Sequence, residues 1–430
     1  MARRLLNTTM AVLGAGVLMM SARALAEPDD RFWPQWRGPQ MTGVSPTADP
    51  PVEWSETTNI RWKVPIPGRA SASPVVWGDH VFVLTAVSAS GATSAGVLHT
   101  FVVMAVDRKT GRTVWERTAR EAPPHEATHS ENGTYASPSA VTDGEHVIAS
   151  FESFGLYAYD MKGTLVWEKD LGDKRMRNTF GEGSSPALHG NTLVVNWDHQ
   201  GQSFIVALDK RTGGELWRQN RDEIDSWFTP LVVTVNGRAQ VITGAMNRIQ
   251  SYDLATGEVV WHTAGLTMNP IPSPVAADDL VILMSGFRGN SLKAIRLSQA
   301  TGDITGTEAI AWTYGRDTPY VPSPLLYDGL LYMLKSNNGI LSVFDAKTGA
   351  PHYLTQRLDA VPNVFASPVG AAGRVYIPGR EGDTLVLRHG PTFEVLAVNS
   401  LDDGFDASPA LVDGEIYLRG YRHLYCVARN

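Results

Sequence analysis

The sequence predicts an all-β fold: a single β-propeller of eight blades, each a four-stranded antiparallel sheet. The first observation is an internal repeat in which a small residue precedes Ser-Pro or Thr-Pro. It recurs eight times, with prolines at 74, 138, 186, 230, 274, 324, 368 and 409. The second is that turn pairs such as Gly78-Asp79 alternate with short apolar strands such as Val81 to Leu84. The third is the absence of any helical period within a repeat.

The second half of each repeat has its own pattern. A strand ends in Asp, a turn containing Thr-Gly follows, and the next strand carries Trp, as in Asp107, Thr110-Gly111 and Trp115. We expect structural roles for these positions, because every blade needs them. The Trp would pack against the neighbouring blade, and the Asp would accept backbone N–H bonds in the turn.

The ends of the repeat array predict how the ring closes. The eighth repeat begins at Ser408-Pro409, but the sequence reaches Asn430 before a fourth strand. A matching strand lies in residues 57–66, ahead of the first repeat. We therefore expect residues 57–430 to form the propeller, with residues 57–66 completing blade eight beside Leu424 to Val427.

Two segments precede the propeller. Residues 1–26 have the order of a secretory signal peptide: Arg3 and Arg4, an apolar run, and Ala24-Leu25-Ala26. We expect cleavage after Ala26 and a periplasmic location, by either the general or the twin-arginine export route. Residues 27–56 are rich in proline and contain two tryptophans, which favours an extended arm lying on the propeller.

Composition limits the classes of partner. Cleavage after Ala26 would change the net charge from −7 to −10, because three arginines are removed. Nucleic acid is therefore not an expected partner, and we expect a monomer without a membrane anchor after cleavage. The only cysteine, Cys426, lies in an apolar strand pattern and is expected to be a buried thiol. The expected partner is therefore another protein or a small polar ligand.

The repeat resembles that of the pyrroloquinoline-quinone (PQQ) type of propeller. Its blade motif A-x-D-x-x-T-G-x-x-x-W reads ALDKRTGGELW at residues 207–217. The opening WPQWRGP at residues 33–39 is similar to the start of an exported subgroup of that family. The match covers the expected mature chain, and it is specific for the fold rather than for an activity.

The resemblance implies two kinds of function. One branch of the family holds quinoprotein dehydrogenases with PQQ and Ca²⁺, and the other holds scaffolds such as the barrel-assembly lipoprotein BamB. This sequence lacks the adjacent Cys-Cys pair, the Trp-Asp-Tyr-Asp segment and the haem motif of the first branch, and the lipid-bearing Cys of the second. We therefore expect a periplasmic binding or scaffolding module. The alternative is a divergent PQQ-dependent alcohol or sugar dehydrogenase, with Glu182, Asn269 and Asp198 or Asp406 around Ca²⁺.

The repeat also predicts where a ligand would bind. Loops that enter the inner strands and loops between second and third strands gather at one mouth of a propeller channel. Such a mouth suits a planar or carboxylate-bearing ligand. The candidate residues are Arg69, Tyr135, Glu182, Trp197, His199, Trp227, Asn269, Arg288, Tyr320, Lys335, Arg380 and Asp406. A third hypothesis is a polysaccharide or peptide binder that stacks on Trp227, Tyr135 and Tyr320.

One further pair of residues has metal-ligand spacing. His125 and His129 lie four residues apart in an insertion, and both would share a face if the segment formed a helical turn. The sequence fixes no third ligand, so this spacing alone does not predict a metal site.

Overall fold

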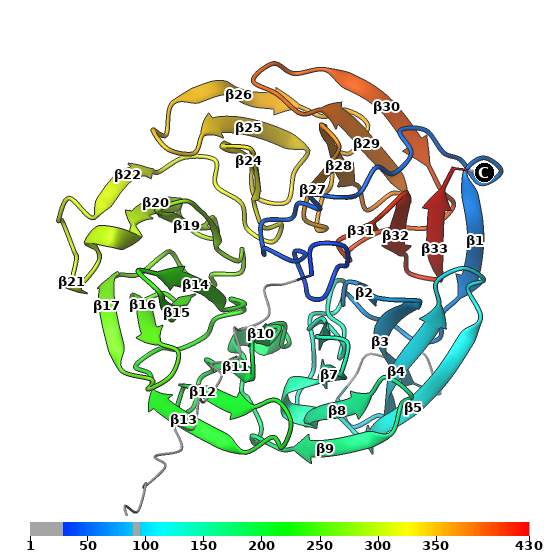
Figure 1. The fold of residues 1–430 in the computed structure, drawn as a ribbon, viewed down its shortest axis with the longest axis horizontal. Coiled ribbons are helices and arrows are strands. Elements are labelled where there is room, and N and C mark those ends of the chain that lie inside the picture. The colour runs from blue at the N-terminus through cyan, green and yellow to red at the C-terminus, as the bar shows by residue number, and fades with distance from the viewer. Residues whose placement is uncertain (1–28, 89–94, 430) are drawn as a thin grey trace, which may run out of the picture.

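The computed structural model describes residues 29–88 and 95–429, and its strands form eight sheets around a central axis (Figure 1). The predicted eight-bladed propeller is confirmed. The predicted signal peptide and residues 89–94 lie outside the described residues. Within the described ranges, no helix is long and apolar enough to cross a lipid bilayer.

The first four blades follow one another along the chain, each built from the axis outward. Blade one contains β2 (Val75–Trp77), β3 (His80–Ser88), β4 (His99–Asp107) and β5 (Thr113–Ala122). Blade two contains β6 (Val141–Thr142), β7 (His146–Ser150), β8 (Leu156–Asp160) and β9 (Leu165–Lys169). Blade three contains β10 (Ala187–His189), β11 (Thr192–Trp197), β12 (Phe204–Asp209) and β13 (Glu215–Asn220). Blade four contains β14 (Leu231–Val235), β15 (Arg238–Gly244), β16 (Arg248–Asp253) and β17 (Val259–Ala264), with β21 (Gly302–Asp303) paired parallel to β17.

The other four blades complete the ring. Blade five contains β18 (Val275–Ala277), β19 (Leu280–Ser285), β20 (Ser291–Arg296) and β22 (Ile310–Tyr314). Blade six contains β23 (Leu325–Tyr327), β24 (Leu330–Leu334), β25 (Ile340–Asp345) and β26 (Pro351–Arg357). Blade seven contains β27 (Val369–Ala371), β28 (Arg374–Pro378), β29 (Asp383–Arg388) and β30 (Val395–Ser400). Short 3₁₀ turns η1 (Glu152–Phe154), η2 (Arg177–Thr179) and η3 (Leu297–Gln299) lie in the connections.

Blade eight is assembled from both ends of the chain. Its inner strands are β31 (Ala410–Val412), β32 (Glu415–Arg419) and β33 (His423–Ala428), and its outer strand is β1 (Ile60–Pro65). β1 runs antiparallel to β33, with Trp62 opposite Cys426 and Val64 opposite Leu424. The N-terminal strand therefore closes the ring, as predicted.

The repeated Trp and Gly positions join neighbouring blades at five of the eight junctions between described strands. Trp167 of blade two donates its indole N–H to the carbonyl of Lys210 in blade three (2.7 Å), and Trp217 does the same to Leu254 (2.8 Å). A Cβ on Gly213, whose φ is +68°, would lie 2.8 Å from the Trp167 ring. Only glycine allows both that backbone conformation and that approach. The motif is therefore a contact between blades.

A second contact between blades surrounds the axis. In seven of the eight junctions, a backbone N–H of the inner-strand Ser donates to the hydroxyl of the Ser or Thr in the next blade, at 2.9–3.1 Å (Ser73 to Ser139, Ser139 to Ser185, Ser185 to Thr229, Ser273 to Ser323, Ser323 to Ser367, Ser367 to Ser408 and Ser408 to Ser73). We call these residues the hydroxyl ring. In blade two the ring residue is Ser139, so the repeat there is displaced by two residues from the expected Ser137-Pro138. Ser137-Pro138-Ser139 offers two serines, and only the strand that follows decides between them.

The arm before β1 lies across one face of the propeller (Figure 1). It pairs with two inner strands: Trp33 exchanges backbone hydrogen bonds with Val76 of β2, and Ser45 donates its N–H to the carbonyl of Gly370 in β27. Arg37 is 1% exposed and donates to the carbonyls of Pro324 (2.7 Å) and Pro368 (2.8 Å). The arm therefore covers the channel at the end opposite the loops that enter the inner strands.

Candidate functional site

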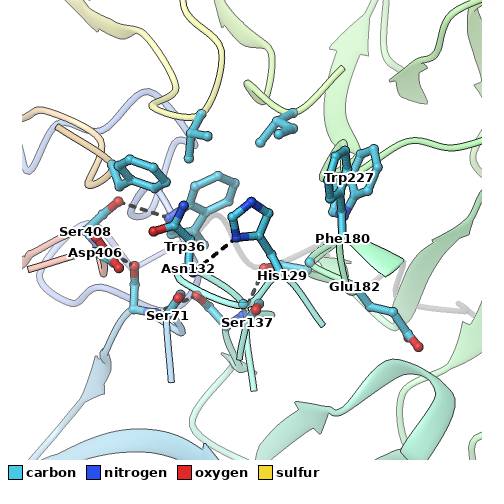
Figure 2. Close-up of a pocket in the computed structure, with 18 of the residues that line it drawn as sticks. Trp36, Ser71, His129, Asn132, Ser137, Phe180, Glu182, Trp227, Asp406 and Ser408 are labelled. Carbon is cyan, nitrogen blue, oxygen red and sulfur yellow. Dashed lines mark hydrogen bonds between the residues drawn. The ribbon is translucent and has the colours of Figure 1, made fainter. Parts of the chain in front are cut away.

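A cavity of about 230 Å³ lies on the propeller axis, at the open end of the channel (Figure 2). Its outer wall comes from loops that precede the inner strands of several blades. Its inner end is formed by Trp36 of the arm and by hydroxyl-ring residues Ser73, Ser139, Ser185 and Ser408. Because Trp36 donates its indole N–H to the Ser408 hydroxyl (3.4 Å), arm and ring together close this end. We call this cavity the axial pocket.

Aromatic side chains form much of the wall of the axial pocket. Phe180, Trp227, Tyr320 and Phe365 line it, and each comes from a different blade connection. The Trp227 indole N–H donates to the carbonyl of Gly181 (2.7 Å), which fixes the ring, and Tyr320 stacks on Phe287 with centroids 4.7 Å apart. Rings held in this way offer flat apolar surface to a ligand at little entropic cost.

The insertion after blade one adds a polar part of the wall. His129 Nδ1 accepts the backbone N–H groups of Glu131 and Asn132, both at 3.3 Å. A neutral imidazole accepting at Nδ1 carries its proton on Nε2, so His129 has an N–H left to donate. Asn132 has a buried side-chain oxygen without a hydrogen-bond partner among the described residues. Both residues line the axial pocket (Figure 2).

Two carboxylates line the axial pocket, and both are engaged by the protein. Arg380 donates to both oxygens of Asp406, at 2.7 and 3.1 Å. Glu182 accepts the backbone N–H of Ser153 (3.0 Å) and its hydroxyl proton (2.6 Å). Figure 2 shows the Glu182 carboxyl group directed away from the other labelled residues. Neither group is therefore available to a cation in the pocket.

The charge on Glu182 depends on a buried neighbour pair. Lys174 and Glu152 form an ion pair at 2.7 Å, and their side chains are 1% and 2% exposed. Burial, and then the nearby negative charge of Glu152, raise the pKa of Glu182 to about 8. Two carboxylates share one ammonium, so protonation of Glu182 removes the excess negative charge from the cluster. Burial and this shared ammonium therefore favour the protonated form of Glu182 at neutral pH.

This arrangement predicts a pH-dependent stability. Because the folded-state pKa of Glu182 is raised above 4.5, the folded protein binds more protons than the unfolded chain between pH 4.5 and 8. Its contribution is complete below pH 4.5 and is lost as the pH rises to 8, with a slope of at most about 1.4 kcal/mol per pH unit. Glu182→Gln, which keeps the shape and cannot ionise, should flatten the curve. The check is urea unfolding at several pH values, and parallel curves for wild type and variant would contradict it.

The carboxylates and amide that the resemblance implied for Ca²⁺ do not form a site. Asp198 is fully buried and paired with Arg221, which donates from Nε (2.7 Å) and Nη2 (3.2 Å). Asn269 is 2% exposed, and its amide has no hydrogen-bond partner among the described residues. Of the four implied ligands, Glu182 and Asp406 line the axial pocket, where each is already engaged, and Asp198 and Asn269 do not. The residues therefore do not fit the PQQ–Ca²⁺ arrangement.

Four of the twelve expected mouth residues, Glu182, Trp227, Tyr320 and Asp406, line the axial pocket. The others lie elsewhere. Trp197 is 1% exposed beneath the Lys174 ammonium (4.6 Å), and His199 is 8% exposed and accepts the N–H of Arg175 at Nδ1. Lys174 and Arg175 thus cover the end of β11 and the turn after it, and these two side chains lie outside the axial pocket.

The remaining expected residues lie outside the lining of the axial pocket. Arg69 is exposed and donates to the carbonyl of Glu131 (3.4 Å), and Arg288 is exposed over the ring of Phe287. Lys335 pairs with Asp317 at 2.8 Å, and Arg380 supports Asp406 from outside the pocket. Tyr135 donates its hydroxyl to the carbonyl of Glu126 (3.1 Å) and lines a separate cavity of about 20 Å³.

The structure separates the two histidines with metal-ligand spacing. A ring nitrogen of His125 contacts the carbonyl of Lys174 (2.8 Å), whereas His129 lines the axial pocket. In the part of the chain that the structure describes, the group with metal-ligand geometry is Asp143, Glu145 and His146, and the Lys210 ammonium already pairs with Asp143 there. That ammonium occupies the place a cation would take.

Sequence reasoning did not find several residues of the axial pocket. These are Trp36, His129 as a wall residue, Asn132, Phe180, Phe365 and the ring serines. The recurrence of Ser rather than any small residue before proline was an available signal. The arm and the insertion gave no such signal, because their positions follow from docking rather than from the repeat.

The fold and the axial pocket define a class of protein: an eight-bladed propeller with an axial cavity closed at one end. A family model described as "Outer membrane protein assembly factor BamB" matches residues 49–202 and 201–430. The chain belongs to this family of PQQ-type repeat propellers, and the predicted resemblance is confirmed.

Individual relatives match more weakly. The outer membrane protein assembly factor BamB of Francisella salina is 29% identical over 100 residues, 23% of this chain and 18% of that protein. Quinoprotein ethanol dehydrogenase of Pseudomonas putida is 28% identical over 161 residues, 34% of this chain and 25% of that protein. The match thus spans at most about a quarter of these two relatives. The structure of quinohemoprotein alcohol dehydrogenase from Comamonas testosteroni superposes with a TM-score of 0.65 at 12% identity, over 94% of this chain and 82% of that one, which shows the shared fold.

Proposed function

We propose that this protein is an exported binding module whose axial pocket holds a small ligand with a flat apolar body. The observation that carries the proposal is the pocket itself. It is about 230 Å³ in volume, is walled by fixed aromatic rings and is closed at its inner end by the arm. Concave, largely apolar cavities with a few placed polar groups are the usual form of a small-molecule site.

Family membership supports the binding role. Relatives described as outer membrane protein assembly factors are named for the assembly of outer membrane proteins, and three of them match between 23% and 46% of this chain. A module of this family that presents loops of eight blades at one mouth is suited to hold a partner or a ligand there. This membership supports a binding or scaffolding role in the periplasm.

The residues of the pocket also favour binding over quinoprotein catalysis. Asp198 is held by Arg221 outside the pocket, and Asp406 is held by Arg380. We expect 5 mM CaCl₂ to leave the melting temperature unchanged in the presence and absence of PQQ. A rise in melting temperature that requires both CaCl₂ and PQQ would support the dehydrogenase alternative instead.

The binding role is tested with two flat probes, 2-naphthalenemethanol and 2-naphthoate, by isothermal titration calorimetry. We expect at least one probe to bind the wild type and Trp227→Ala to weaken it about tenfold, the effect of losing about 1.4 kcal/mol of ring contact. The control is Phe393→Ala, because Phe393 packs on Tyr353 just before the outer strand β30 and lies outside the lining of the pocket. The proposal fails if neither probe binds, or if both variants weaken binding equally.

A further inference from the structure

The hydroxyl ring has unused hydrogen-bonding capacity at the inner end of the axial pocket. Ser73, Ser139, Ser185 and Ser408 each accept a backbone N–H from the preceding blade at 2.9 Å. They are 2–4% exposed, and all four line the pocket. Within the described residues, none of the four hydroxyl protons has an acceptor. A hydroxyl that accepts an N–H bond becomes a better donor, so these groups need an acceptor.

The charge beneath the ring has the sign that an anion requires. Arg37 donates to the carbonyls of Pro324 and Pro368, each of which directly follows a ring serine. Its hydrogen-bond partners are neutral carbonyls, and it forms no ion pair with a described carboxylate. Burial lowers the pKa of Arg37 to about 9, which keeps the guanidinium protonated at neutral pH. A buried charge without a counter-ion is costly and favours an anion nearby.

The groups that would repel an anion are neutralised. Asp406 is bonded by Arg380 through both oxygens, and the Glu182 carboxyl group is directed away from the ring, with a pKa that burial raises toward the protonated form. His129 adds an N–H donor on the wall. The polar lining is therefore rich in donors, and its two acids are not free.

We infer that the inner end of the axial pocket is an oxyanion site. A carboxylate or phosphate head group accepts hydrogen bonds from the ring hydroxyls on the propeller axis, and the flat apolar part of the same ligand lies between the aromatic residues of the wall. This rests on the proposed function, since it names the class of ligand that the same pocket takes. The class is an aromatic or otherwise planar acid, bound without a metal ion.

The test compares three probes of one shape: 2-naphthoate, 2-naphthyl phosphate and the neutral 2-naphthalenemethanol. We expect at least one anion to bind the wild type ten times more tightly than the alcohol at pH 7 and low salt. The tighter of the two anions identifies the head group. Ser73→Ala and Ser185→Ala should each weaken the anion about tenfold, because hydrogen bonds to charged groups are the strong ones, and should leave the alcohol within about twofold.

The matched control is Ser367→Ala. Ser367 also accepts a ring N–H at 2.9 Å, but it does not line the pocket. Its substitution therefore removes the same structural hydrogen bond and should leave anion affinity unchanged. Equal affinity for all three probes, lost in Trp227→Ala, would overturn the oxyanion site and leave the proposed function standing. Absence of binding by every probe would overturn both. Equal losses in Ser367→Ala and Ser73→Ala would overturn the assignment to the lining serines.

Discussion

A chain that begins at residue 67, without β1, is expected to lose most of its stability. Single domains are stable by only about 5–15 kcal/mol, and the loss of β1 leaves β33 with an unpaired edge. It also removes Trp62, which is 8% exposed, donates to the carbonyl of Arg108 (2.9 Å) and packs on Gly111 of blade one. Circular dichroism during thermal unfolding measures the effect.

A second variant of the truncated chain restores the closing strand at the C-terminal end. Because Ile60 lies opposite Val427 in an antiparallel pair, residues 59–66 can follow residue 429 through a short Asn-Gly turn and form a hairpin with β33. This variant also lacks the arm, so it differs from the truncated chain only in the closing strand and its turn. We expect it to recover a cooperative transition. Equal melting temperatures for the truncated and rescued chains would show that ring closure contributes little.

Arg221→Met is expected to lower stability by about 3–5 kcal/mol, which is the usual effect of removing one partner from a buried ion pair. Asp198 would keep only the Asn196 amide (3.2 Å), while the hydroxyl of Tyr252 would lose its donor from Arg221 (2.8 Å). Chemical denaturation of purified variants gives the free energy of unfolding.

The double variant Asp198→Asn, Arg221→Met is the control. Because neither buried charge remains, the double variant should recover part of the free energy of unfolding that Arg221→Met loses. The non-additivity of the two substitutions measures the coupling energy between Asp198 and Arg221. If Arg221→Met leaves stability unchanged, Asp198 is not held by this pair. It would then again be a candidate ligand in the dehydrogenase alternative.

The fold was predictable because the residues that form the contacts between blades recur at fixed positions of the sequence repeat. The Trp that donates to the next blade, the Gly that admits its ring and the Ser that joins the hydroxyl ring recur in sequence at the positions where they recur in space. Blade two shows the limit of this reasoning. Ser137 and Ser139 flank the same proline, and the ring uses Ser139, which only the start of β6 reveals.

The site was predictable only where it follows the repeat. Trp227, Tyr320 and Asp406 sit just before inner strands, and the structure places them in the axial pocket. Trp36 and His129 come from the arm and an insertion, so no repeat position indicates them. The sequence also did not indicate which charged side chains form ion pairs. Asp198 follows β11 and Arg221 follows β13, and their spacing in the sequence does not show that Arg221 Nε lies 2.7 Å from Asp198 Oδ1.

Our central proposal is that the axial pocket receives the acidic end of a ligand at the hydroxyl ring. A crystal structure of the protein soaked with 2-naphthoate tests this directly. We predict the carboxylate within hydrogen-bond distance of at least two of Ser73, Ser139, Ser185 and Ser408, with the naphthalene ring against Trp227 or Phe180. A carboxylate at the rim beside Arg288 or Lys335, or a pocket empty at saturating ligand, would contradict it.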